Sequence, residues 1–389
     1  MLFSRSSRWL CLVLVAPSLS CNGPVDNGGD DSGTMVKNTD SGYAGDDGGV
    51  ADAGIRPVPG CPTAPPFDLA SPQLQKCFEP VLVAIGDRSR RIVSFDAVNW
   101  LGDTIDDGNV VNGQALDDGA AQAAFGKGYI VTASDFGIFT SADRGLTWTK
   151  APPPAAQQWG QGVHVSPVLF NGTLFIVFSD TTSFTSEDAY TWVKHSLSDL
   201  AGSHLAFYGR AVGKDGRIVS NGGGSEVNVS DDGVTWRKVD TTLTGGMPSM
   251  AYGNGVFVAV GKRARIYSTD NGETWHKVVD DCSGNDPVKC IGDYPSKMLF
   301  HDGVFTFTNG AGQSSILQST DGQTWVKIGD GFGFDWQHEF FKGVDYAAQS
   351  GNTYRKGASA GGDWSSMSFS TSHSGYGIGS FSTGLVLKR

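Results

Sequence analysis

A short signature that ends in Trp recurs along the chain and constrains its fold more than any other feature. It reads YSTDNGETW at 267–275, TSADRGLTW at 140–148, VSDDGVTW at 229–236 and QSTDGQTW at 318–325. Three incomplete copies of the signature end at Trp100, Trp192 and Trp364. Successive Trp residues are 39 to 50 residues apart, and a fixed period in this range is typical of repeat architectures.

Each repeat also carries a strand pattern upstream of the signature. AYGNGVFVAVG (251–261) leads into one signature, and AAFGKGYIVTAS (123–134) and LFHDGVFTFTNG (299–310) lead into others. An aromatic residue, a tight Gly turn and alternating apolar residues predict four antiparallel strands per unit, a to d, joined by hairpins. Seven such units cannot bury both faces alone, so we expect an all-β, seven-bladed β-propeller of four-stranded antiparallel blades over residues 61–389.

The first unit is short of one strand. We expect VLVAIGD (81–87), RRIVSFD (90–96) and the segment at Trp100 to be its strands b, c and d. The C-terminal GYGIGSFSTG (375–384) is then predicted to supply strand a and to close the ring by pairing the two chain ends. The final LVLKR also resembles a strand b, which leaves an alternative register open.

The signature Ser-x-Asp-(x)-Gly-x-Thr-Trp resembles the Asp-box, or bacterial neuraminidase repeat. Sialidases, sortilin-type receptors, xyloglucan-cleaving hydrolases and photosystem II assembly factors carry it, and the resemblance spans residues 78–389. It implies a propeller with the boxes on the c–d hairpins, and it implies no particular activity, because these families share the box and not a function. The residues matched to a structural box are Ser141, Asp143, Gly145, Trp148, Asp188, Trp192, Ser230, Asp232, Trp236, Ser268, Asp270, Gly272, Trp275, Ser319, Asp321 and Trp325.

Physical reasoning also favours a structural role for the signature. An Asp carboxylate in a hairpin accepts hydrogen bonds from turn N–H groups, Gly adopts backbone conformations that a side chain opposes, and Trp buries a large ring. Catalysis needs a nucleophile and a base that converge on one point. Copies spread around a ring point apart, so we expect the functional groups to lie on the opposite face.

The N-terminus has the features of an export signal. Arg5 and Arg8 precede the apolar run 9–16, which is too short to span a bilayer as a helix. Residues 1–20 resemble a bacterial lipoprotein signal, which implies a lipid anchor at Cys21 and a place at the cell envelope, in the outer membrane or on the cell surface. Free secretion after cleavage behind Ser20 is the alternative.

Composition sets the expectations for the remaining parts of the chain. Residues 21–60 are rich in Gly and Asp with few large apolar residues, which predicts a disordered acidic tether. The formal net charge is -11 and the sequence has no large basic cluster, so we expect no nucleic-acid binding. In an exported protein the remaining cysteines favour two local disulfides, Cys61 with Cys77 and Cys282 with Cys290.

Candidate binding residues lie on the variable d–a links and the b–c turns, because loops on a rigid scaffold are where binding groups tend to sit. Trp159 and Trp336 are the tryptophans after the expected signal that lie outside the signatures. An exposed indole beside polar groups suits a sugar ring. The alternative is that both indoles have a structural role and cover the edges of blades. The candidate ligand-binding residues are Trp159, His164, His204, Arg263, Arg265, Tyr294, Trp336 and His338.

Three functions remain open from the sequence. The first is a surface-tethered, non-catalytic propeller that binds a glycan or a protein. The second is a carbohydrate-active enzyme, a glycoside hydrolase or polysaccharide lyase, with Asp335, Glu339 and His338 as catalytic candidates. A typical sialidase is disfavoured because its Arg-Ile-Pro segment is missing. The third is an envelope assembly scaffold. We expect a monomer with no cofactor and no metal.

Overall fold

The computed structural model describes part of the unit Asp52–Arg389. Residues 76–388 are described except for 107–109, 112–113, 116–121, 135–136, 155–166, 180–181, 198–199, 201–208, 223, 242–248, 262, 279–285, 293–294, 310–314, 331–336, 350–351, 357–363, 370–371 and 374–376. The expected signal, Cys21 and the acidic tether lie outside the described residues. No helix in the described part of the chain is long and apolar enough to cross a membrane.

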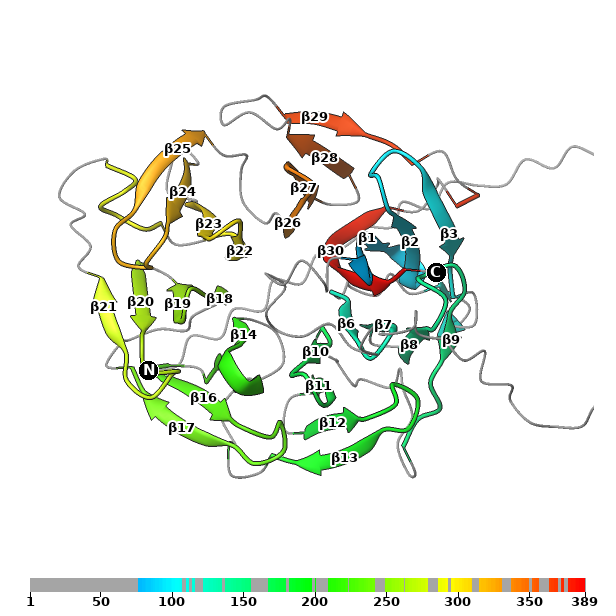
Figure 1. The fold of residues 1–389 in the computed structure, drawn as a ribbon, viewed down its shortest axis with the longest axis horizontal. Helices are drawn as coiled ribbons and strands as arrows, with labels where there is room; N and C mark the ends of the chain where they lie inside the picture. The colour runs from blue at the N-terminus through cyan, green and yellow to red at the C-terminus, as the bar shows by residue number, and fades with distance from the viewer. Residues whose placement is uncertain are drawn as a thin grey trace, which may run out of the picture. The chain divides into compact units, whose positions relative to one another are not determined.

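The described strands form four-stranded antiparallel sheets arranged radially around a common axis (Figure 1). Two sheets are formed by β6 (Ala124–Gly126), β7 (Tyr129–Ser134), β8 (Gly137–Ser141) and β9 (Thr149–Lys150), and by β10 (Leu169–Phe170), β11 (Phe175–Ser179), β12 (Thr182–Ser186) and β13 (Val193–Ser196). Two more are formed by β14 (Arg210–Val212), β15 (Ile218–Asn221), β16 (Glu226–Ser230) and β17 (Arg237–Asp240), and by β18 (Ser249–Gly253), β19 (Val256–Gly261), β20 (Ala264–Ser268) and β21 (His276–Val278). A further two are formed by β22 (Leu299–His301), β23 (Val304–Asn309), β24 (Ser315–Ser319) and β25 (Val326–Asp330), and by β26 (Gln337–Phe341), β27 (Val344–Gln349), β28 (Asn352–Lys356) and β29 (Trp364–Met367).

One more sheet, here called the closing blade, joins the two ends of the described chain. Its strands are β1 (Phe78–Gly86), β2 (Arg90–Ser94) and β3 (Trp100–Thr104) together with β30 (Ile378–Leu387). β30 runs antiparallel to β1, with Phe78 opposite Leu387 and Ile85 opposite Ser380. The expected all-β propeller of four-stranded antiparallel blades is therefore confirmed. Six blades are each built from four consecutive strands, whereas the unit around Trp100 becomes a blade only by taking β30.

The alternative reading of the C-terminus is wrong. The residues LVL do not begin a separate strand b, because they are the end of the ten-residue strand β30. The small hairpin of β4 (Val110–Val111) and β5 (Gln114–Ala115) was not predicted. The short 3-10 turns η2 (Asp87–Ser89) and η4 (Lys214–Gly216) lie in connections between strands.

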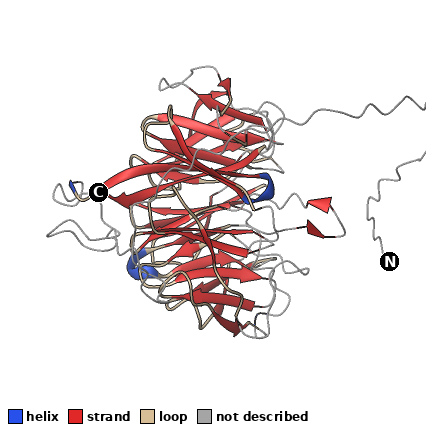
Figure 2. Ribbon diagram, turned by 90° about the vertical axis from the view of Figure 1, so that its right-hand side faces the viewer, coloured by secondary structure: helices blue, strands red, loops and turns tan. Residues whose placement is uncertain are grey.

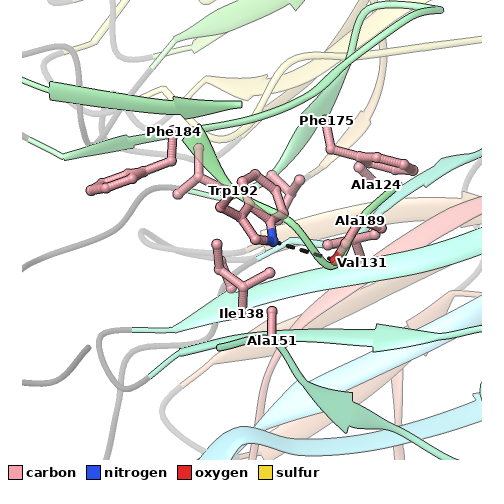
Figure 3. Packing of buried hydrophobic residues seen from close by; sticks show 11 residues of the cluster. Ala124, Val131, Ile138, Ala151, Phe175, Phe184, Ala189 and Trp192 are labelled. Carbon is pink, nitrogen blue, oxygen red and sulfur yellow. Dashed lines mark hydrogen bonds between the residues drawn. The ribbon is translucent and has the colours of Figure 1, made fainter. Parts of the chain in front are cut away.

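The apolar core lies between neighbouring blades. Trp192 packs in one cluster with Phe175 and Phe184 of its own blade and with Val131 and Ile138 of the preceding blade (Figure 3). Burying apolar surface contributes about 25 cal/mol per Å², and here only adjacent blades together can bury it. This explains why the strands b and c are apolar on both faces.

The two faces of the ring differ in their connections. In the six blades built from consecutive strands, the a–b and c–d hairpins lie at one end and the b–c turns and d–a links lie at the other, because consecutive strands are antiparallel. We call these ends the hairpin face and the link face. Figure 2 shows the blades from the side, with the two faces at opposite edges of the disc.

Candidate functional site

The catalytic-looking signatures are closed hydrogen-bonded turns on the hairpin face. In one copy the Asp143 carboxylate accepts hydrogen bonds from the Ser141 hydroxyl at 2.8 Å, the Thr147 N–H at 2.8 Å and the Thr147 hydroxyl at 2.6 Å. The Ser141 hydroxyl in turn accepts the Gly145 N–H at 2.7 Å. The same Ser–Asp contact occurs at Asp96, Asp188, Asp232, Asp270 and Asp321.

These hydrogen bonds stabilise the ionised carboxylates. Burial alone would raise the pKa of Asp270, but hydrogen bonds from Thr274 and Ser268 outweigh it and lower the pKa to about 2. The pKa values of Asp188, Asp232 and Asp321 are lowered in the same way. For Asp96 the N–H groups of Asn99 and Val98 are the main cause of the lowered pKa. A carboxylate held in this way is a poor proton donor near neutral pH.

The Trp that ends each turn is fixed by its own N–H. The indole Nε1 donates to a carbonyl three residues earlier in five copies, at Trp148, Trp192, Trp236, Trp275 and Trp325. The ring is thereby placed against the preceding blade. Ser, Asp, Gly and Trp of these turns serve the hairpin and the blade contact, which leaves the link face and the central axis as places for a ligand.

Most of the predicted ligand-binding residues lie outside the described residues. Trp159, His164, His204, Tyr294 and Trp336 belong to this group, as does the catalytic candidate Asp335. The main chain of His338 is part of β26, but its side chain is not described. The side chains of Arg263, Arg265 and Glu339 are described, and they do not lie together.

Glu339 lies on an innermost strand and links three blades. Its Oε2 pairs with Lys297 Nζ at 2.9 Å, from the segment just before β22, and its Oε1 accepts the Thr383 hydroxyl of β30 at 2.9 Å. Its side chain is 14% exposed and that of Lys297 is 23% exposed. Both oxygens of this carboxylate are thus engaged, and a general acid or nucleophile would have to break these contacts before it could act.

This cluster is part of a series of contacts between innermost strands. The Met298 N–H donates to the Ser249 hydroxyl, which links β18 to the segment before β22. The Ala123 N–H donates to the Ser382 hydroxyl at 2.8 Å, which links the closing blade to the next one. Glu339 connects these two pairs, because it contacts Lys297, next to Met298, and Thr383, next to Ser382. Sequence reasoning missed Lys297 and Thr383, because neither residue stands out until adjacent blades are placed side by side.

The two predicted arginines have different environments. Arg265 is 2% exposed, and its guanidinium lies 5.9 Å from the Trp325 ring of the next blade. This placement serves blade packing, and it does not present the side chain to a ligand. Arg263 is exposed in the β19–β20 turn on the link face, where its main-chain N–H donates to the Gly292 carbonyl at 3.3 Å.

The Arg263 contact belongs to an ordered part of the longest d–a link. Asn309, which is fully buried, accepts the Gly292 N–H at 2.8 Å and donates to the carbonyls of Pro287 and Cys290 at 2.9 and 2.7 Å. One side chain therefore fixes residues 287–292 above the end of β23. The sequence signal was a polar residue at the end of a buried apolar strand. Cys61 and Cys282 lie outside the described residues, so the two disulfide pairings stay predictions.

A cation lies on the innermost ring across from Glu339. Arg210 begins β14, which lies three blades away from β26 (Figure 1). Burial lowers its pKa to about 9, which still leaves the guanidinium charged at neutral pH. Among the described residues, no group of three or more His, Cys, Asp or Glu is placed to hold a metal ion.

Comparisons with known proteins find similar solved structures at low sequence identity and no family. No protein-family model matches the chain, and no curated protein matches it significantly. Among solved structures, YCF48 bound to D1 peptide is 14% identical with a TM-score of 0.49, covering 68% of this chain and 84% of that chain. YCF48 from Cyanidioschyzon merolae is 14% identical with a TM-score of 0.45, covering 62% and 81%. Trypanosoma rangeli sialidase is 14% identical with a TM-score of 0.38, covering 71% and 56%.

Proposed function

We propose that the chain is a non-catalytic, envelope-anchored propeller that binds an extended glycan or a protein through its link face. The lipid anchor at Cys21, the tether and the location at the cell envelope are parts of this proposal. The observation that carries this proposal is that Lys297 and Thr383 contact the Glu339 carboxylate. Glu339 is the catalytic candidate whose side chain the structure describes, and these contacts give it a structural role.

The positions of the strands that flank the two Trp-bearing links favour an extended ligand. Trp159 belongs to the connection from β9 to β10, and Trp336 belongs to the connection from β25 to β26. The strands that the two connections join end on the link face at this point, and the two sets of strands lie across the ring from each other (Figure 1). We infer that a ligand held at both connections spans the ring, and such a ligand is longer than a single sugar ring.

The test is binding of glycans and envelope proteins to the full mature chain and to variants. We expect Trp159→Ala and Trp336→Ala each to weaken binding, and the double variant to abolish it, because truncating an aromatic anchor of a binding site costs more than about 1 kcal/mol. Val326→Ala is the control, since Val326 is 56% exposed on an outermost strand. Binding that survives in the double variant contradicts the proposed site.

The alternative is a carbohydrate-active enzyme, and Glu339 allows a direct test. Turnover on a polysaccharide panel that Glu339→Gln abolishes, while Thr383→Val preserves it, would establish a catalytic carboxylate. We expect no turnover in the wild-type chain. A stable partner that co-purifies independently of both Trp side chains would instead favour an envelope scaffold.

A further inference from the structure

The outermost strand of five consecutive blades carries Lys at the same repeat position. It is the second residue after the signature Trp, within the sequences WTK, WVK, WRK, WHK and WVK. These belt lysines are Lys150, Lys194, Lys238, Lys277 and Lys327. All five are exposed. The preceding position is also exposed but is occupied by Thr, Val, Arg, His and Val, so the recurrence of Lys is specific to one position.

Every belt lysine lies on a sheet edge. Among the strands that the structure describes, β9, β13, β17, β21 and β25 are the terminal strands of their sheets, and each pairs with one neighbouring strand. An edge strand presents unpaired N–H and C=O groups that can pair with a strand of another molecule. Val193 and Val326, directly before Lys194 and Lys327, are 54% and 56% exposed. A β-branched apolar residue on an open edge favours such pairing.

Ion pairing within the chain does not explain the belt. Lys238 Nζ lies 3.3 Å from Glu226 Oε2 on a neighbouring strand, and Lys327 Nζ lies 2.7 Å from Asp330 Oδ1 on its own strand. Lys150 instead pairs with Asp106, which follows β3 of the closing blade, at 3.0 Å. The partners of these three lysines have no common position in the repeat, and exposed pairs of this kind contribute about 0–1 kcal/mol.

The closing blade has a local reason to lack this Lys. Gly102 takes the position on β3, and a Cβ there would lie 2.4 Å from the Gly145 carbonyl oxygen of the next blade. The neighbouring turn thus covers β3 at this point. In β29 the position is Ser366.

We propose that the belt lysines keep the outer strands from pairing with the outer strands of a second copy of this chain. A strand that docks at any one of these five edges would have to desolvate the ammonium group of the Lys on that edge. A role in binding a polyanion fits less well, because the five side chains lie on blades that face different directions around the ring. The formal net charge of -11 also opposes it.

The experiment compares Lys194→Thr/Lys327→Thr with the charge-matched control Lys214→Thr/Lys289→Thr, whose lysines lie in turns. We expect the first variant to form dimers and larger species in sedimentation velocity as its concentration rises, and the control to behave as wild type. Equal association of both variants would overturn the proposal, since net charge would then be the cause. Unchanged monomers that lose retention on a heparin column would overturn it in favour of polyanion binding.

A second variant covers the case in which the Thr variant fails to fold. Lys194→Glu/Lys327→Glu keeps a charge at both edges, and we expect it to remain as monodisperse as wild type. Association of this folded Glu variant to the extent of the Thr variant would contradict protection of the edge by charge.

Discussion

At the residue scale, the same position in the repeat can be filled by chemically different side chains when the blade contact allows it. Three residues before the signature Ser, on the third strand, the chain has Ile138, Val227 and Ile316 in three blades, and Arg91 and Arg265 in two others. All five are buried. Arg91 lies 3.8 Å from the Phe139 ring centroid, so an aromatic face of the next blade stabilises the cation. A buried Arg here is a packing residue.

The signature carboxylates make stability depend on pH. Their pKa values are lower in the folded chain than the ordinary value of 3.8. The unfolded chain therefore binds more protons in acid, and the stabilisation is present above about pH 4 and is lost as pH falls towards the folded pKa of Asp270, about 2. We expect the free energy of unfolding, measured by urea titration, to fall between these pH values.

Asp270→Asn tests the assignment. We expect a loss of about 1–2 kcal/mol at pH 7, from the broken contacts to Ser268 and Thr274, and a shallower fall in acid. Gln323→Ala is the control, because Gln323 is an exposed residue of an equivalent turn. An acid slope equal to that of wild type in Asp270→Asn would contradict the assignment.

At the element scale, four of the a–b hairpins repeat one backbone conformation. Both residues of these two-residue turns have positive φ, as in Asn254 at 50° and Gly255 at 79°, which suits the twist of paired strands. These hairpins also reach the next blade, since the Asn254 amide donates to the carbonyls of Gly303 and Thr320 at 2.9 and 3.0 Å. The turn residues therefore set the strand register and a blade contact together.

Two glycines of this hairpin separate backbone strain from steric contact. A Cβ on Gly255 meets nothing within 4 Å, whereas a Cβ on Gly253 lies 2.3 Å from the Phe300 ring of the next blade. We expect Gly255→Ala to cost about 1 kcal/mol from positive φ, and Gly253→Ala to cost about 1–3 kcal/mol from overpacking. Thermal unfolding measures both.

A double-mutant cycle identifies the steric partner. Phe300→Leu should relieve part of the destabilisation by Gly253→Ala and none of that by Gly255→Ala. Additive effects of Gly253→Ala and Phe300→Leu would show that the two residues do not meet.

At the scale of the whole molecule, polar contacts reinforce closure of the ring. Arg90, 1% exposed, forms two hydrogen bonds to Asp103, at 2.7 and 3.1 Å, and the same carboxylate accepts the His373 N–H at 2.8 Å. The Asp87 carboxylate accepts the Gly377 N–H at 2.7 Å. The segment that precedes β30 in the chain is thus attached to the closing blade by these polar contacts, in addition to the pairing of β30 with β1.

We expect Asp103→Asn to weaken this closure by about 3–5 kcal/mol, because it leaves the Arg90 charge buried without its partner. Amide hydrogen exchange should speed up in β30 and β1 before it does in β18–β21. Asp330→Asn is the matched control, since Asp330 is 80% exposed in its pair with Lys327, and its effect should be near zero. Uniform loss of protection around the ring would contradict a local closure.

The sequence by itself determined the local structure. Periodic Trp, Gly and alternating apolar residues specify hairpins and blades through contacts between residues close together in the chain, so the strands of the Trp100 unit were predictable. The pairing of the chain ends was predictable for a different reason, because that unit has three strands where the other units have four. The turn chemistry of Ser141, Asp143 and their equivalents was predictable for the same reason.

Only the tertiary structure decided which polar residues meet across blades. Glu339, Lys297 and Thr383 come from three blades, and Arg265 is a packing residue because Trp325 of the next blade faces it. The strands joined by the connections that carry Trp159 and Trp336 likewise proved to lie across the ring from each other (Figure 1). Contacts between residues far apart in sequence depend on the stacking of rigid blades, and no pattern within one repeat encodes the neighbour that a side chain will face.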